Sequence, residues 1–111
     1  MDCIFCKIAH GEIPTSPVYE NEHLVVIRDI DPKAPHHLLI IPKKHLASVM
    51  DLSDPALALA IVRATQHVAK ELGIDATGFR LLTNVGEDGG QSVPHLHWHL
   101  LGGRKMDWPP G

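Results

Sequence analysis

The chain carries the stretch His95-Leu96-His97-Trp98-His99-Leu100-Leu101, in which imidazole and apolar side chains alternate. A period of two is that of a β-strand and not that of a helix. On a strand over residues 95–101 the three imidazoles lie on one face, about 6.7 Å apart from one to the next. Leu96, Trp98 and Leu100 then point into the core. This stretch predicts the last strand of an antiparallel sheet.

Outward from this stretch, the sequence predicts four more strands. Leu38–Ile41 is a continuous apolar run ended by Pro42, which is typical of a strand covered on both faces. Asn21 and Glu22 separate two short runs that form a hairpin, and Asp29–Pro35 carries the prolines and acids of a loop. The four predicted strands are residues 18–20, 24–28, 38–41 and 79–83.

Two helices complete the prediction. The long one spans Asp54–Leu72, with Ser53 or Asp54 as its N-cap, Pro55 in its first turn and Gly73 after its end. A short one spans Asp2–His10, with Asp2 as its N-cap. The apolar side chains of the long helix recur at helical spacing and are expected to face the sheet: Leu57, Ala60, Ile61, Ala64, Val68 and Leu72. The sum is one α+β domain over residues 1–111, an antiparallel five-stranded sheet with one long helix and a short N-terminal helix.

Composition narrows the class of protein. The chain has 111 residues and a formal net charge of −3, which argues against a non-specific nucleic-acid binder. Because it contains no run of about 18 apolar residues, we expect no membrane span. The N-terminal MDCIFCKIAHGE does not read as a signal peptide, and two nearby cysteines favour a reducing compartment. These features predict a cytoplasmic protein.

Three aligned histidines allow three interpretations. They form a polar face that uses histidine by coincidence, a metal site, or a site for nucleophilic and acid–base catalysis at phosphorus. Coincidence is a poor account, since aligned imidazoles on a half-buried strand are desolvated and repel one another when protonated. The preceding loop, Asn84–Ser92, favours catalysis. Gly89 and Gly90 let backbone N–H groups approach a phosphate, and Asn84, Gln91 and Ser92 add polar side chains.

The pattern His-φ-His-φ-His-φ-φ resembles the signature of the histidine triad (HIT) superfamily. Other segments resemble its Hint branch and extend the likeness over nearly the whole chain. They are Ile4-Phe5, Glu12-Ile13-Pro14, Asp29–Pro35, Ile41–His45, Gly89–Val93, Leu101–Arg104 and Trp108–Gly111. The resemblance implies the HIT-like fold and a homodimer whose sheets join edge to edge.

The resemblance also implies an activity, the hydrolysis of purine nucleoside 5′-phosphoramidates through a nucleotidyl-histidine, with no cofactor needed for the chemistry. By position, His97 matches the nucleophile, His99 the group that binds phosphate and aids proton transfer, and His37 the histidine that orients the triad. The remaining matches contact substrate: Asp29 and Ile30 at the ribose and base, Asn84 at the ribose or phosphate, Gly90, Gln91 and Ser92 at the phosphate, and Trp108 at the partner's site. Two alternatives remain, a dinucleoside polyphosphate hydrolase and a nucleotide-binding regulatory protein with incidental activity.

The pair Cys3-x-x-Cys6 has three interpretations: a redox motif, half of a zinc site, or two small buried side chains. Redox motifs of this kind usually follow a strand, and none is predicted before Cys3. A closed zinc site needs two more ligands. The family resemblance implies that His45 and His95 complete it, which gives a structural Cys₂His₂ zinc site separate from the chemistry at His97.

Overall fold

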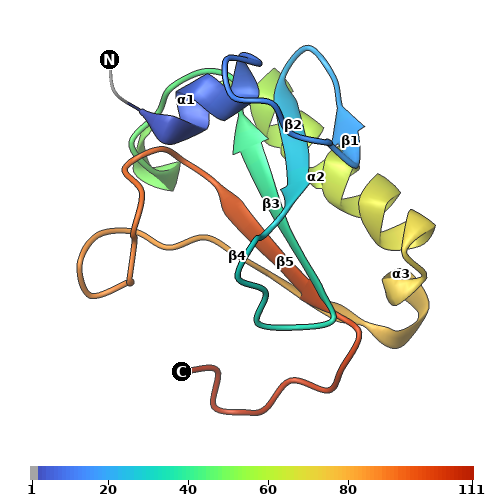
Figure 1. Ribbon diagram of the computed structural model, residues 1–111. Helices are drawn as coiled ribbons and strands as arrows, with labels where there is room; N and C mark the ends of the chain where they lie inside the picture. The colour runs from blue at the N-terminus through green and yellow to red at the C-terminus, as the bar shows by residue number, and fades with distance from the viewer. Residues whose placement is uncertain (1–2) are drawn as a thin grey trace.

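A computed structural model describes residues 3–111 and confirms the predicted α+β architecture. Five strands form one antiparallel sheet in the order β1-β2-β3-β5-β4 (Figure 1). The elements in chain order are α1 (Ile4–Ala9), β1 (Tyr19–Glu20), β2 (Leu24–Arg28), β3 (His36–Pro42), the 3-10 helix η1 (Val49–Asp51), α2 (Pro55–Glu71), α3 (Ile74–Thr77), β4 (Phe79–Leu82) and β5 (Trp98–Gly102). The short elements η1 and α3 are additions that the sequence pattern did not predict.

The sheet separates two apolar layers. On one face, α2 packs over alternate residues of β2, β3 and β5, among them Leu38, Ile40 and Leu100, which are fully buried. On the other face, the short helix α1 packs Phe5 against Leu39 and Ile41 of β3. The central strand β3 is therefore covered on both sides, as its continuous apolar run predicts (Figure 1).

The long helix begins and ends where its local signals place it. The carboxylate of Asp54 accepts a hydrogen bond from Ala56 N at 3.0 Å, and Pro55 occupies the first helical position. Gly73 follows the end of the helix with φ of +73°, a conformation that costs a glycine little. Because its caps are local, this helix could be predicted to within one residue at each end.

Several predicted boundaries were wrong. Strand β3 runs from His36 to Pro42 and not over residues 38–41, and the other large errors lie at the first helix and the last strand. The short helix begins at Ile4, because Cys3 is its N-cap and the Cys3 Sγ accepts a hydrogen bond from Cys6 N at 3.4 Å. Asp2, the predicted cap, lies outside the described residues. The last strand begins at Trp98 and not at His95. The N–H groups of His95 and Leu96 bond instead to the carbonyls of Val93 and Leu46, at 2.8 and 2.7 Å. The ladder to β3 therefore starts at Trp98.

None of the helices formed by residues 3–111 is both long enough and apolar enough to span a lipid bilayer.

Candidate active site and metal centre

The three histidines of the run lie on the α1 face of the sheet, although only His99 is on a strand. The Phe5 ring lies with its centroid 4.8 Å from the His97 ring and 6.0 Å from the His95 ring. The His97 and His99 rings are 5.1 Å apart. His95 and His97 are buried, so this row of imidazoles forms part of the wall between α1 and the sheet.

A backbone carbonyl determines the tautomer of the neutral His97 ring. Its Nδ1 lies 2.7 Å from the carbonyl oxygen of His95. Because a carbonyl only accepts hydrogen bonds, Nδ1 carries the proton and Nε2 of the neutral ring keeps its lone pair. Thr83 Oγ1 donates to the His97 carbonyl at 2.7 Å and holds the residue from the other side. In the neutral ring of His97, Nε2 is thus available as a nucleophile or a base.

A second series of hydrogen bonds determines the tautomers of His37 and His99. Lys33 N donates to His37 Nδ1 at 3.0 Å, which leaves the His37 proton on Nε2. That Nε2 lies 2.9 Å from His99 Nδ1, so His99 accepts there and carries its own proton on Nε2. The carboxylate of Asp29 lies 3.4 Å from the same His37 nitrogen. His97 therefore offers a lone pair and His99 an N–H donor from neighbouring rings.

Burial sets the charge of this network. Desolvation lowers the pKa of both His37 and His99, and the Asp29 carboxylate offsets only part of that effect. For His99 the neighbouring rings of His97 and His37 lower the pKa further. Both imidazoles are therefore neutral at pH 7, as the hydrogen bond between them requires.

This charge state predicts a pH-dependent stability. Because the pKa values of His37 and His99 are lower in the folded chain than in the unfolded one, the unfolded chain takes up protons first as the pH falls below about 6.5. Stability is then lost toward acidic pH, by up to about 1.4 kcal/mol per pH unit for each imidazole. Urea unfolding between about pH 8 and about pH 5 measures this slope. His37→Gln should make it shallower, and an unchanged slope in His37→Gln would contradict the assignment.

In the loop before the three histidines, two side chains that the family resemblance places near the substrate instead make hydrogen bonds to the protein backbone. Asn84 Nδ2 donates to the Gly89 carbonyl at 2.7 Å. The Gln91 amide accepts from Gly86 N at 3.0 Å and donates to the carbonyls of Ala47 and Val93 at 2.7 and 3.1 Å. These two amides hold the loop in shape together with two backbone hydrogen bonds, from Gly90 N to the Glu87 carbonyl and from Gln91 N to the Gly86 carbonyl, both at 3.0 Å. The Ser92 residue stays exposed.

Gly89 is required by a close approach of the backbone. A Cβ at this position would lie 2.3 Å from the Val85 carbonyl oxygen, and Gly90 has φ of +73°. We expect Gly89→Ala to open the loop and weaken AMP binding by about 1–3 kcal/mol, roughly five- to 150-fold. Isothermal titration with AMP measures the effect, with the exposed neighbour Asp88→Ala as the matched control. Unchanged AMP affinity in Gly89→Ala would show that the loop does not hold the nucleotide.

Ile30 and Trp108, the other two predicted substrate contacts, lie in different parts of the molecule. Ile30 is fully exposed at the edge of an apolar pocket of about 620 Å³. This pocket is also lined by Ile8 of α1 and Ile27 of β2. Trp108, by contrast, lies against the guanidinium of Arg80, 5.8 Å from it, and is 81 % exposed. Arg80 pairs with Leu101, so Trp108 lies at the opposite end of the β4–β5 pair from His97.

The four residues assigned to zinc come together. The thiol sulfurs of Cys3 and Cys6 and Nδ1 of His45 and His95 all lie within 4.8 Å of one another. His95 Nδ1 is 3.3 Å from Cys3 Sγ, 3.5 Å from Cys6 Sγ and 3.1 Å from His45 Nδ1, and Cys6 Sγ is 3.2 Å from His45 Nδ1. A tetrahedral zinc site places its ligand atoms about 3.3–3.8 Å apart, so the donor set fits that ion.

The surroundings of the cluster favour a cation. His95 Nε2 lies 2.8 Å from the Pro42 carbonyl, which puts the proton there and leaves Nδ1 free to ligate. Burial lowers the pKa of His95 and therefore keeps it neutral. Burial and the adjacent Cys3 thiol raise the pKa of Cys6. A positive ion at the cluster would counteract this effect and favour the Cys6 thiolate.

Sequence reasoning missed three contributors to the site. Phe5 supports two of the histidines, the His95 carbonyl fixes the tautomer of His97, and the Lys33 N–H fixes that of His37. The only sequence signal for any of them is the position of Phe5 between the two cysteines.

Comparisons with known proteins agree with this geometry. The HIT domain family matches residues 10–106. A HIT family hydrolase from Legionella pneumophila Philadelphia 1 is 50 % identical, with a TM-score of 0.95 over 99 % of this chain and 100 % of that one. A histidine triad nucleotide-binding protein from Candida albicans is 34 % identical, with a TM-score of 0.85 over 97 % of this chain and 83 % of that one. A 14 kDa zinc-binding protein from Brassica juncea is 42 % identical over 99 % of this chain and 100 % of its own length. This chain belongs to the HIT domain family.

Proposed function

We propose that this protein is a nucleotide-binding hydrolase that cleaves purine nucleoside 5′-phosphoramidates to the nucleoside monophosphate and an amine. The observation that carries the proposal is the pair of fixed tautomers, the His97 Nε2 lone pair beside the His99 Nε2–H. A nucleophile next to a proton donor is what the displacement of an amine at phosphorus requires. Its relatives include proteins described as a hydrolase and as nucleotide-binding.

In the first step, His97 Nε2 attacks the α-phosphorus and the P–N bond breaks, with its electron pair going to the amine nitrogen. His99 Nε2–H donates its proton to the departing nitrogen while its Nδ1 keeps accepting from His37 Nε2–H, and the water consumed in the second step returns a proton to His99. The carboxylate of Asp29, 3.4 Å from His37 Nε2, helps to hold that ring in place against His99. Water then cleaves the nucleotidyl-histidine and frees Nε2.

In the proposed complex, the purine lies in the apolar pocket beside Ile30. The ribose hydroxyls donate hydrogen bonds to the Asp29 carboxylate. The phosphate lies at the backbone N–H and hydroxyl of Ser92 and beside Gly90, where glycine leaves room for close approach. The Cys3–Cys6–His45–His95 cluster is assigned to a structural zinc ion, which contributes folding energy and takes no part in phosphoryl transfer.

The proposal includes a homodimer. The outer edge of β4 has no neighbouring strand within the part of the chain that the structure describes, and Phe79 and Leu81 of this strand are 39 % and 36 % exposed. Such an edge is suited to pairing with a second copy. Analytical ultracentrifugation would give a dimer mass, and a monomer at micromolar concentration would remove this part of the proposal.

The decisive experiment compares substrates. AMP release from adenosine 5′-phosphoramidate should exceed release from diadenosine tetraphosphate in kcat/KM. The reverse order would favour a dinucleoside polyphosphate hydrolase. AMP binding without turnover of either compound would favour a nucleotide-binding protein with a regulatory role. Loss of AMP binding on chelation, with no turnover, would instead favour a triad that binds metal.

A further inference from the structure

Helix α1 belongs to two sites at once. Cys3 is its N-cap and Cys6 is its third residue, so both thiols of the Cys–His cluster hold its first turn. Between them, Phe5 is buried and packs edge-on against the His97 ring, at 4.8 Å and 85°. Farther along the helix, Ile8 lines the apolar pocket assigned to the base. A shift of α1 would therefore change the nucleophile's support and the base pocket together.

His95 makes the same connection through the backbone. Its ring nitrogens face Cys3 and the Pro42 carbonyl, and its own carbonyl accepts from His97 Nδ1. The side chain is fully buried, so its position is determined by these partners. Whatever holds the His95 ring in place also holds the hydrogen-bond acceptor that sets the tautomer of His97.

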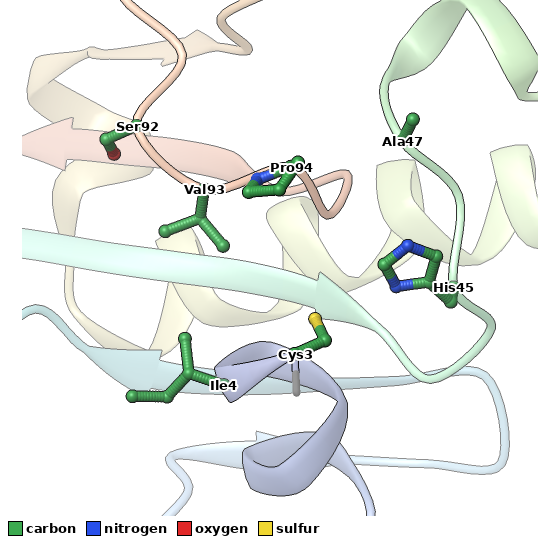
Figure 2. A pocket seen from close by; sticks show the side chains of 7 residues that line it. All are labelled: Cys3, Ile4, His45, Ala47, Ser92, Val93 and Pro94. Atoms are coloured by element: carbon green, nitrogen blue, oxygen red, sulfur yellow. The ribbon is translucent and has the colours of Figure 1, made fainter. Parts of the chain in front are cut away.

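The cluster is open to solvent on one side. A pocket of about 590 Å³ is lined by Cys3 and His45 at one end and by Val93 and Pro94 of the loop before the triad at the other. Figure 2 shows Cys3 and Ile4 below the loop that carries Val93, with His45 to one side. His45 is exposed, and both cysteines are partly exposed. A divalent ion or a chelator can therefore reach the ligands without unfolding of the chain.

We propose that Cys3 and Cys6 are positioning residues for the hydrolytic site: with a divalent ion bound they clamp α1 against His95 and His97, and loss of the ion slows turnover. This inference rests on the proposed function. Phosphoryl transfer is sensitive to small displacements of the nucleophile, so an unclamped α1 is expected to lower kcat about ten- to a hundredfold. The sheet and α2 form a separate apolar layer and stay folded.

The test compares reduced wild-type protein loaded with zinc and the same protein stripped by a chelator. Three quantities are measured: kcat for adenosine 5′-phosphoramidate, amide hydrogen exchange in α1 and α2, and AMP affinity. We expect stripping to lower kcat about ten- to a hundredfold and to speed exchange in α1 while α2 keeps its protection. Cys6→Ser should behave like the stripped protein at every zinc concentration, and Lys44→Gln, an exposed neighbour of His45, should behave like the loaded wild type.

A second variant keeps the inference testable if the stripped protein unfolds. Phe5→Leu retains all four ligands and an apolar side chain, so it should bind zinc normally and yet lose kcat about tenfold. Unchanged kcat in Phe5→Leu, or equal kcat in loaded and stripped wild type, would overturn the clamp. If the loaded wild type has no turnover, the proposed function fails. The clamp on α1 then stands if stripping speeds exchange in α1 while α2 keeps its protection, and falls if exchange in α1 is unchanged.

Discussion

Replacing His97 by alanine is expected to lower the hydrolysis of adenosine 5′-phosphoramidate by about four to six orders of magnitude. The reason is that no other ring in the row combines the same two properties. His97 has its Nδ1 proton committed to the His95 carbonyl and its Nε2 free, whereas His99 and His37 are linked to each other through Nδ1 and Nε2. AMP should still bind, because the loop and the apolar pocket do not depend on the His97 ring.

The measurement is single-turnover release of AMP, accompanied by mass spectrometry for a covalent nucleotidyl adduct. The adduct should form on wild type and be absent from His97→Ala. His67→Ala, a half-exposed histidine on the outer side of α2, is the matched control and should keep full activity. Equal AMP release by wild type and His97→Ala would move the chemistry to another residue.

Removal of the metal should give the largest change in stability. We expect about one zinc per chain. A bound ion that is a thousandfold above its dissociation constant stabilises the folded state by about 4 kcal/mol, so chelation should lower the melting temperature by roughly 15 °C or more. The cluster joins α1, the segment after β3 and the segment before β5, which lie far apart in the chain.

Elemental analysis and thermal unfolding with and without a chelator test this expectation. The double variant Cys3→Ser, Cys6→Ser supplies the control, since its melting temperature should already be low and should not respond to the chelator. A metal-free wild type that melts at the same temperature as the zinc-loaded protein would show that the cysteines are merely two reduced side chains.

The parts of the fold that the sequence predicted are those determined by neighbouring residues. Asp54, Pro55 and Gly73 determine both ends of α2. The alternation of the triad predicted one strand for all three imidazoles, but only His99 lies on β5. The start of β5 was mispredicted because Leu96 N bonds to the carbonyl of Leu46, fifty residues earlier in the chain. A local pattern carries no information about such a partner.

The candidate site divides in the same way. Residue types and spacing pointed to His97, His99 and the four cluster residues, and the structure brings each set together. The tautomers could not be predicted, because they depend on one backbone N–H, at Lys33, and one backbone carbonyl, at His95. The structural role of Gln91 could not be predicted either, because its amide donates a hydrogen bond to the Ala47 carbonyl in a distant segment.

The two-sided burial of β3 has a consequence for how this protein can evolve. Leu38 and Ile40 face α2, whereas His37 and Leu39 face the imidazole row and α1. Neighbouring residues of this strand are thus expected to be under different selective constraints. In a scan of β3 variants, changes at positions 38 and 40 should lower cellular abundance, and changes at 37 and 39 should lower specific activity. New specificities can therefore arise on one side of the strand while the other side preserves the folded population.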